Sequence, residues 1–166
     1  MRFAIGLARA NVDHGTGGPF GAVVFDRHNS RLVAPGVNLF VATNCTVAHA
    51  EMVAIILAQR SIEHFDLGAK GQPPHELVTS AEPCAMCLDA ISWSGARHVV
   101  CGAHHENARA LGFDEGPKPL DWVGELECRG ISVTRDVCRE EAAEVLRYHA
   151  ESGGEIYNAR GGGQSE

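Results

Sequence analysis

Two short segments contain side-chain types that hold a transition metal. The first is His49-Ala50-Glu51, and the second is the run Pro83-Cys84-Ala85-Met86-Cys87. Soft thiolates combined with an imidazole favour zinc in a tetrahedral site. We therefore expect zinc to be bound by His49, Cys84 and Cys87, which leaves one position for water, as in catalytic zinc sites. With Glu51 two residues from His49, the set predicts a hydrolytic site in which a carboxylate moves protons.

Both segments fall near the start of a predicted helix. Apolar residues recur at three- and four-residue spacing over 47–60, and Pro83 opens a second helix over 84–94, which Gly95 ends. Thiols three positions apart on a helix face the same side, so both can reach one ion. The N-terminal end of a helix also lowers the pKa of a thiol, which favours metal binding at neutral pH.

Other functions of the C-x-x-C pair stay open at this point. A redox pair is disfavoured because the flanking sequence has no thioredoxin-like context. A structural zinc site would need a fourth protein ligand, for which Cys45, His98 and Cys101 are candidates. A non-catalytic zinc module is a further alternative, and the presence of Glu51 argues against it.

The remaining hydrophobic patterns alternate between helix and strand. We expect helices over 1–13, 104–111 and 136–151, the last capped by Asp136. Strands are predicted over 20–25, 32–37, 76–80, 97–102 and 131–134, with the first two forming a hairpin and 112–122 forming a loop. Helices alternating with strands after residue 46 predict an α/β sandwich with a partly parallel sheet.

Length, composition and charge limit the partners. The 166 residues predict a single domain over 1–166, and a net charge of −7 argues against nucleic acid, which is bound mainly through Lys and Arg. No apolar stretch approaches the roughly 20 residues that span a membrane. The opening residues 1–6 lack the features of a secretory signal, so we expect a cytoplasmic protein with reduced cysteines.

The order of these motifs resembles the cytidine deaminase-like superfamily, whose zinc deaminases carry H-x-E followed by P-C-x-x-C. Over nearly the whole chain the sequence is similar to its bacterial guanine deaminase branch, particularly a subgroup that also acts on s-triazines such as ammeline. The matching blocks are 17–25, Asn38, 48–51, 79–87, 112–116 and 156–160. The segment 39–47 departs from that pattern and should line the pocket, so the preferred base stays open.

The resemblance implies a three-layer α/β/α sandwich with a five-stranded mixed sheet, and a homodimer. It implies an aminohydrolase that acts on the C–N bonds of cyclic amidines and converts guanine to xanthine and ammonia. Glu51 would take a proton from water and later protonate the leaving amine. Alternative substrates for the same chemistry are s-triazines, 5-azacytosine and isoguanine-like rings. A tRNA adenosine deaminase is disfavoured because residues 120–166 are strongly acidic.

The same resemblance assigns two polar positions near the base. Asn38 would hold the ring, since an amide both donates and accepts hydrogen bonds. Glu115 would contact the substrate and assist proton transfer, with Asp114 as a possible substitute. From the residues alone, a turn role for Asn38 and a solvated loop carboxylate at Glu115 are the alternatives.

Aromatic residues complete the implied site. Phe20 and Trp93 match positions near the pocket, although a role in the core is equally compatible with each. Tyr157 belongs to the C-terminal segment 152–166, which the resemblance places over an active site, in some relatives that of the partner subunit. The other four cysteines have no derived function and are expected to be buried thiols: Cys45, Cys101, Cys128 and Cys138.

Overall fold

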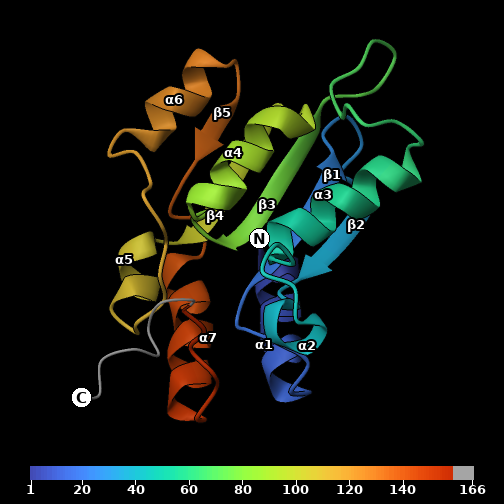
Figure 1. Cartoon of the computed structure of the whole chain (residues 1–166). Helices are drawn as coiled ribbons and strands as arrows, with labels where there is room; N and C mark the ends of the chain where they lie inside the picture. Colours follow the sequence, from blue (N-terminus) through green and yellow to red (C-terminus); the bar gives the residue numbers. More distant parts are fainter. Residues whose placement is uncertain (159–166) are drawn as a thin grey trace.

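A five-stranded mixed sheet forms the centre of the protein in the computed structural model, which describes residues 1–158 (Figure 1). The strand order is β2-β1-β3-β4-β5. β1 pairs antiparallel with β2 and β3, whereas β4 and β5 continue the sheet parallel to β3. The strands are β1 (Gly21–Asp26), β2 (Arg31–Val37), β3 (His75–Ala81), β4 (His98–Ala103) and β5 (Ser132–Thr134). The predicted mixed α/β fold is confirmed.

Helices cover both faces of the sheet (Figure 1). On one face lie α1 (Arg2–Asp13) and α7 (Arg139–Glu151), and on the other lie α3 (Ala50–Ser61) and α4 (Ala85–Ser94). Shorter helices occupy the connections: α2 (Phe40–Thr43), α5 (His105–Arg109) and α6 (Trp122–Cys128). No helix within residues 1–158 is long and apolar enough to cross a membrane.

Alternating strand residues separate the two apolar layers. Val24 and Leu77 are buried in the layer that contains residues of α3 and α4, whereas Val23 and Val78 pack with Ala4 of α1. Successive side chains of a strand point to opposite faces, so each strand contributes to both layers. Packing on both faces fixes the sheet against the helices, and it brings the starts of α3 and α4 together beside the end of β3.

The structure corrects the predicted elements in three places. The helices α2 and α6 were not predicted, because segments of four and seven residues are too short to show a helical period. The last helix begins at Arg139 rather than at 136, and Cys138 occupies the cap position. Oδ1 of Asp136 lies instead 2.7 Å from Nε2 of His104, and the cap residue of α7 makes no side-chain hydrogen bond to the helix.

Candidate active site

The predicted metal ligands stand at the starts of two neighbouring helices. His49 is the residue before α3 and Cys84 the residue before α4, and both have extended backbones, while Cys87 lies in the first turn of α4. Cys84 follows β3 by a short connection, so the end of that strand determines where α4 begins. Two helix N-termini meet at this point, and their partial positive charge favours thiolate ligands.

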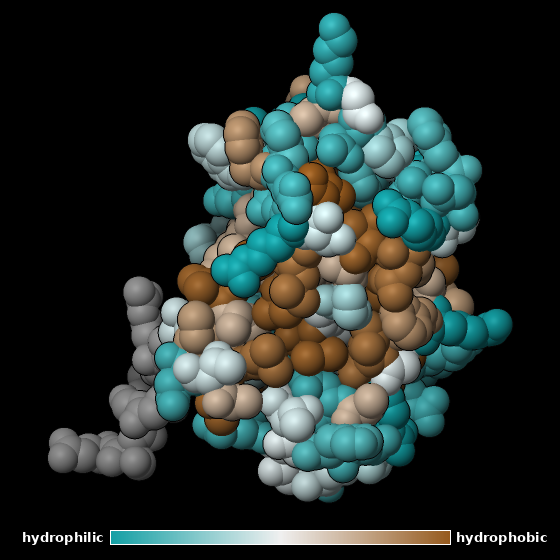
Figure 2. Space-filling model, turned by 90° about the vertical axis from the view of Figure 1, so that its right-hand side faces the viewer, coloured by the Kyte–Doolittle hydropathy of each residue, from teal (hydrophilic) through white to brown (hydrophobic). Residues whose placement is uncertain are grey.

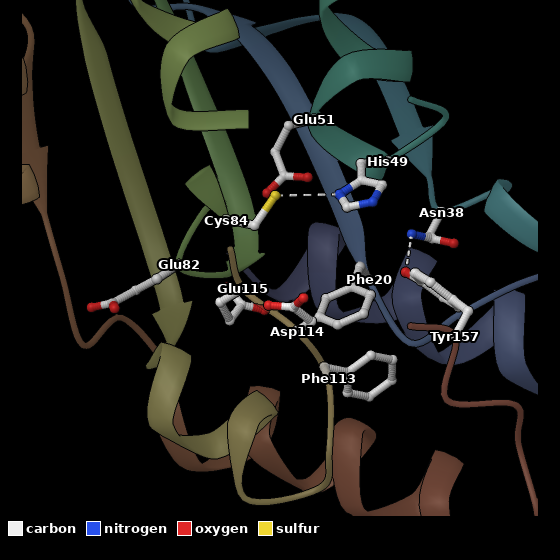
Figure 3. Close-up of a pocket in the computed structure, with 10 residues that line it drawn as sticks. All are labelled: Phe20, Asn38, His49, Glu51, Glu82, Cys84, Phe113, Asp114, Glu115 and Tyr157. Carbon is white, nitrogen blue, oxygen red and sulfur yellow. Dashed lines mark hydrogen bonds between the residues drawn. The ribbon is translucent and has the colours of Figure 1, made fainter. Parts of the chain in front are cut away.

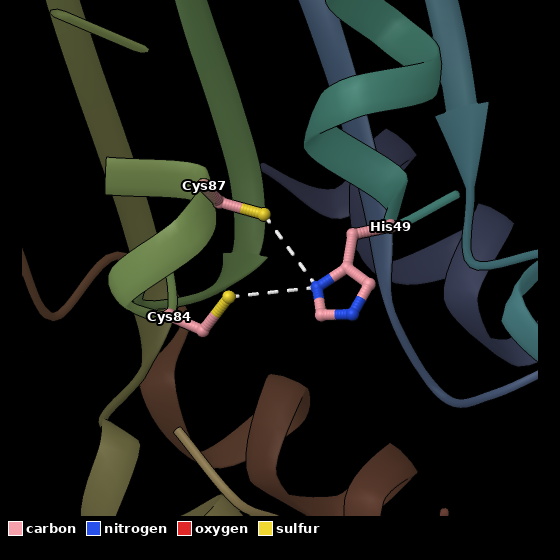
Figure 4. Close-up of side chains that lie close together, drawn as sticks. All are labelled: His49, Cys84 and Cys87. Atoms are coloured by element: carbon pink, nitrogen blue, oxygen red, sulfur yellow. Dashed lines mark hydrogen bonds between the residues drawn. The ribbon is translucent and has the colours of Figure 1, made fainter. Parts of the chain in front are cut away.

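The donor atoms of these residues converge on one point (Figure 4). Nδ1 of His49 lies 3.5 Å from Sγ of Cys84 and 3.6 Å from Sγ of Cys87. Nitrogen and sulfur ligands of a tetrahedral zinc ion are about 3.6 Å apart, given usual bond lengths of about 2.1 Å and 2.3 Å. The three ligand atoms therefore fit zinc, and they would hold it through one nitrogen and two sulfurs.

The two thiols of the set have opposite acidities. A hydrogen bond from Cys87, together with the adjacent His49 ring, lowers the pKa of Cys84 to about 4 despite its burial. The pKa of Cys87 is raised well above its ordinary value, first by its hydrogen bond to Cys84 and then by burial. One thiol is therefore ionised before any cation arrives, and its charge is available to attract one.

Glu51 lies beside the ligand set on the first turn of α3 and is only 7% exposed. Its carboxylate accepts hydrogen bonds from Oγ1 of Thr79 at 3.2 Å and from Sγ of Cys87 at 3.5 Å. Burial, followed by the negative charge of Cys84, raises the pKa of Glu51. A carboxylate held in this way, next to a metal site, is suited to accept and return a proton.

A pocket opens next to the ligands and contains most of the predicted substrate residues (Figure 3). Phe20 packs edge-on against Phe113, with ring centroids 5.1 Å apart. Burial, together with the charges of Cys84 and Glu51, raises the pKa of Glu115 to about 8. The pocket is lined by Phe20, Asn38, His49, Glu51, Glu82, Cys84, Phe113, Asp114, Glu115 and Tyr157.

Asn38 enters the pocket directly after β2 and is 1% exposed. Its amide Nδ2 donates a hydrogen bond to the hydroxyl of Tyr157 at 2.5 Å. The glycines at 17 and 18 permit this position, because a Cβ at Gly17 would lie 1.9 Å from the carbonyl oxygen of Asn38. A Cβ at Gly18 would lie 3.2 Å from Oδ1 of the same residue. The structure thus places Asn38 among the pocket residues, and its Oδ1 also accepts a hydrogen bond from the backbone N–H of Phe40 at 3.2 Å, as in an Asx turn.

Three site residues were not predicted from the sequence. Phe40 stacks on Tyr157, with centroids 4.1 Å apart and an interplanar angle of 16°. It belongs to the divergent segment 39–47, which gave no motif to follow. Phe113 directly precedes the predicted site residues Asp114 and Glu115, and this position in the sequence could have predicted that it lines the pocket.

Glu82, the third of these residues, lines the pocket from the connection that precedes Cys84. Its fully buried carboxylate binds Nδ1 of His105 at 2.8 Å, Nε of Arg135 at 2.6 Å and Nζ of Lys118 at 3.5 Å. Although burial opposes ionisation, these partners, led by His105, lower the pKa of Glu82 to about 2. These contacts hold the connection between β3 and α4 in place.

Other sequence expectations need correction. Trp93 is not among the pocket residues, because it lies near the end of α4 and its side chain is 86% exposed. Of the four cysteines expected to be buried, Cys101 is buried and Cys128 is exposed, while Cys45 and Cys138 are partly exposed. All six cysteines are free. Of the segment 152–166, the part beyond 158 lies outside the described residues.

Comparison with known proteins gives a consistent result. Residues 1–103 match the family described as the cytidine and deoxycytidylate deaminase zinc-binding region. The chain is 39% identical over 115 residues to the guanine deaminase of Bacillus subtilis, and the matched region covers 69% of each protein.

Solved structures extend the similarity to nearly the full chain. The guanine deaminase of Nitrosomonas europaea is 47% identical, with a TM-score of 0.88 over 90% of this chain and 82% of the other. The protein NE0047, crystallised with 2,6-diaminopurine, is 48% identical, with a TM-score of 0.90 over 96% of this chain and 84% of the other.

Proposed function

The chain belongs to the cytidine and deoxycytidylate deaminase family of zinc-binding proteins, and from this premise we propose that it hydrolyses guanine to xanthine and ammonia. The observation that carries the proposal is the convergence of His49, Cys84 and Cys87 beside a pocket that also holds Glu51. Zinc, when bound there, supplies a Lewis acid that makes water a nucleophile at neutral pH. The similarity to guanine deaminases supports the choice of base.

Glu51 moves the protons in this proposal. It takes one proton from the water that adds to C2 of guanine and passes that proton to ring nitrogen N3, and it then carries the remaining hydroxyl proton to the exocyclic nitrogen. The bond between C2 and that nitrogen then breaks, ammonia leaves and the C2 carbonyl of xanthine forms. The position of Glu51, buried and hydrogen-bonded to Thr79, holds the carboxylate in place for both transfers.

Asn38 and Glu115 orient the base. Both line the pocket and both are buried, and the amide of Asn38 can exchange its hydrogen bond with Tyr157 for one with a ring edge. Oε2 of Glu115 has no hydrogen-bond partner among the described residues, and it is available to a substrate nitrogen. Asp114 lines the same pocket from the adjacent position, and Phe20 closes it with an apolar wall.

Replacing Asn38 with alanine is expected to weaken substrate binding. Loss of one amide partner leaves a buried polar edge of the base unpaired, which costs about 1–3 kcal/mol and raises KM roughly 10- to 100-fold. Steady-state kinetics with guanine measure the effect, and Asn29→Ala, an exposed turn residue, serves as the control. An unchanged KM for Asn38→Ala contradicts the assigned contact.

Replacing Glu115 with glutamine is expected to lower kcat by about 10²-fold, because an amide of similar size cannot transfer a proton. Zinc content should stay at the level of the unsubstituted protein, since Glu115 is not a ligand. The matched control is Glu127→Gln, an exposed carboxylate on α6. A turnover close to that of the unsubstituted protein would mean that Glu115 is only a loop carboxylate.

Release of ammonia from a panel of bases tests the choice of substrate. Guanine is compared with ammeline, 5-azacytosine and isoguanine under identical conditions. The proposal predicts the highest kcat/KM for guanine. Ammonia release from a triazine or pyrimidine but not from guanine would support the proposed deamination chemistry and contradict guanine as the substrate.

We also propose a homodimer. Exposed apolar side chains gather around α2 and α3, namely Val41, Val47, Ile56 and Leu57. Figure 2 views that side of the molecule and shows a broad hydrophobic area. Large exposed apolar areas of this kind are typical of subunit interfaces.

Light scattering after size exclusion tests this interface. It should give twice the chain mass of 17.7 kDa, and Leu57→Asp should shift the protein towards single chains. A unit of 17.7 kDa for the unsubstituted protein contradicts the dimer.

A free base, and not RNA, is the proposed partner. The net charge of −7 opposes binding to phosphates, so a tRNA adenosine deaminase function is disfavoured. Salt-sensitive binding of tRNA would reverse this choice. We propose a cytoplasmic location, which six free cysteines support.

A further inference from the structure

A buried ammonium group lies beside the site, and no step of the proposed reaction uses it. The side chain of Lys118 is only 3% exposed, and its Nζ has no hydrogen-bond partner among the described residues. Nζ lies 3.5 Å from Oε2 of Glu82 and 4.2 Å from the centroid of the Trp122 ring. The cation is therefore held between one carboxylate and one aromatic face.

Stability alone does not explain this lysine. Burying an ammonium group costs several kcal/mol, and apolar side chains that replace a buried ion pair are often no less stabilising. Glu82 does not depend on the lysine for neutralisation, because its carboxylate also binds His105 at 2.8 Å and Arg135 at 2.6 Å. Burial lowers the pKa of Lys118, and the negative charges of Glu82 and Glu115 oppose that effect. A cation kept at this cost beside a pocket indicates a functional role.

Lys118 belongs to the loop between α5 and α6, which also carries Glu115. Its backbone N–H donates to the carbonyl oxygen of Gly116 at 2.9 Å, which closes a tight turn directly after Glu115. Oε2 of Glu115 has no partner among the described residues that could hold the side chain. The location of the Glu115 carboxylate therefore depends on how the backbone of this loop is held.

Two contacts attach the loop to residues on either side of the expected ligand Cys84. After Cys84, the N–H of Ala85 donates to the carbonyl oxygen of Glu115 at 2.9 Å. Before Cys84, the side chain of Glu82 meets the ammonium of Lys118, and in Figure 3 its carboxylate points away from the pocket centre. The loop is thus held at two points against the segment 82–85, and the Lys118 contact is the one made by side chains.

We propose that Lys118 is a positioning residue, whose ion pair with Glu82 holds the loop so that the Glu115 carboxylate meets the base beside Cys84. The inference rests on the proposed function and deepens it. Without the ammonium group, the loop keeps its hydrogen bond to Ala85 but loses the second attachment, so it can turn about the first. Such a rotation displaces the Glu115 carboxylate, because Oε2 has no contact that resists it.

Replacing Lys118 with methionine tests the inference with guanine as substrate. Methionine keeps an unbranched side chain that can pack on the Trp122 ring, and Glu82 keeps its other two partners, so the protein should fold. We expect kcat to fall about 10- to 100-fold, because misplacement of a reacting group by about 1 Å costs up to about 10²-fold. KM and zinc content should remain unchanged, since Lys118 neither lines the pocket nor belongs to the ligand set.

Arg135 provides the matched control. Its guanidinium binds the same carboxylate at 2.6 Å, but it follows β5 and lies outside the loop that carries Glu115. Arg135→Met therefore removes a cation from Glu82 without changing the loop, and kcat should stay within about twofold of its original value. An equal loss of kcat in Arg135→Met and Lys118→Met would show that Glu82 only needs a neutralising charge, which overturns the inference.

A double-mutant cycle with Glu115→Gln shows whether Lys118 acts through Glu115. In that background Lys118→Met should lower kcat less than about twofold, because the carboxylate that it positions is already absent. Thermal unfolding checks that each variant folds, and Lys118→Gln, which keeps a polar end without the charge, replaces the methionine variant in the cycle if that one does not.

The remaining outcomes separate the inference from its alternatives. An undiminished loss of kcat in the Glu115→Gln background would show that Lys118 acts independently of Glu115. A raised KM with unchanged kcat would show that it only shapes the pocket, and loss of zinc would show that it acts on the ligands. Each of these results overturns the inference while the proposed function stands. Failure of the unsubstituted protein to deaminate guanine overturns both.

Discussion

Replacing Glu51 with glutamine lowers the turnover of guanine by about 10³- to 10⁴-fold, which is the upper part of the range for loss of a general acid–base group. The amide keeps the size of the side chain and can still accept the hydrogen bond from Thr79, but it moves no proton. Because Glu51 is not one of the three expected ligands, zinc content should remain at one ion per chain. Ammonia release and elemental analysis on the same sample measure both quantities.

Substitution of a carboxylate outside the site is the control for a general effect of lost charge. Glu144→Gln removes an exposed carboxylate from α7, far from the ligand set in sequence and outside the pocket lining, and should leave turnover unchanged. If Glu51→Gln retained more than a tenth of the original turnover, a different group would have to carry the proton. If it lost zinc together with activity, Glu51 would instead belong to the metal site.

The second large effect concerns the metal. Replacing Cys87 with alanine removes one of three protein ligands, and we expect both zinc content and turnover to fall below about a tenth of their original values. Structural zinc sites contribute about 10–16 kcal/mol of apparent binding free energy, so loss of one thiolate is severe even if the remaining pair binds weakly. Zinc per chain is measured by elemental analysis after extensive dialysis.

Cys101 offers the appropriate control for this substitution. It is also a fully buried cysteine, but it lies on β4 and belongs to the apolar core and not to the ligand set. Cys101→Ala should retain one zinc per chain and lose some stability through the small cavity that it creates. Full zinc occupancy in Cys87→Ala would contradict the ligand assignment.

The metal-binding part of the site could be predicted because its chemistry is local in the sequence. His49 and Glu51 are two residues apart, Cys84 and Cys87 are three apart, and each pair belongs to one helix start. Helix periodicity places each pair on one side, so only the meeting of the two helices had to be inferred. The long elements were predictable for the same reason, since the buried apolar runs of β1 and β3 and the helical period of α3 are also local in the sequence.

The positions of Tyr157 and Asn158 could not be predicted in this way, because they depend on contacts between segments that are distant in the sequence. Tyr157 meets Asn38 across 119 positions, and Asn158 meets Asp114 across 44. No local spacing marks such pairs. Phe40 entered the site only through the short helix α2, which has too few residues for a period. Trp93 illustrates the opposite error, since an aromatic residue of the ligand helix is 86% exposed and does not line the pocket.

The Asp136 prediction failed because the helix begins later than the sequence indicated. An acidic residue before a helix normally caps its free N–H groups. Here the carboxylate lies against the imidazole of His104, and the helix begins three residues later. The side chain thus contacts a residue of another element, and sequence spacing alone gives no sign of such a contact.

Conversion of guanine by the zinc-loaded protein is the most direct test of the proposed function. Chromatography of the reaction mixture identifies the product, and an ammonia assay counts the nitrogen released. The account predicts xanthine and ammonia in equal amounts, with the activity lost in Glu51→Gln. Unchanged guanine in the presence of stoichiometric zinc, with ammonia released from another base of the panel, would contradict it.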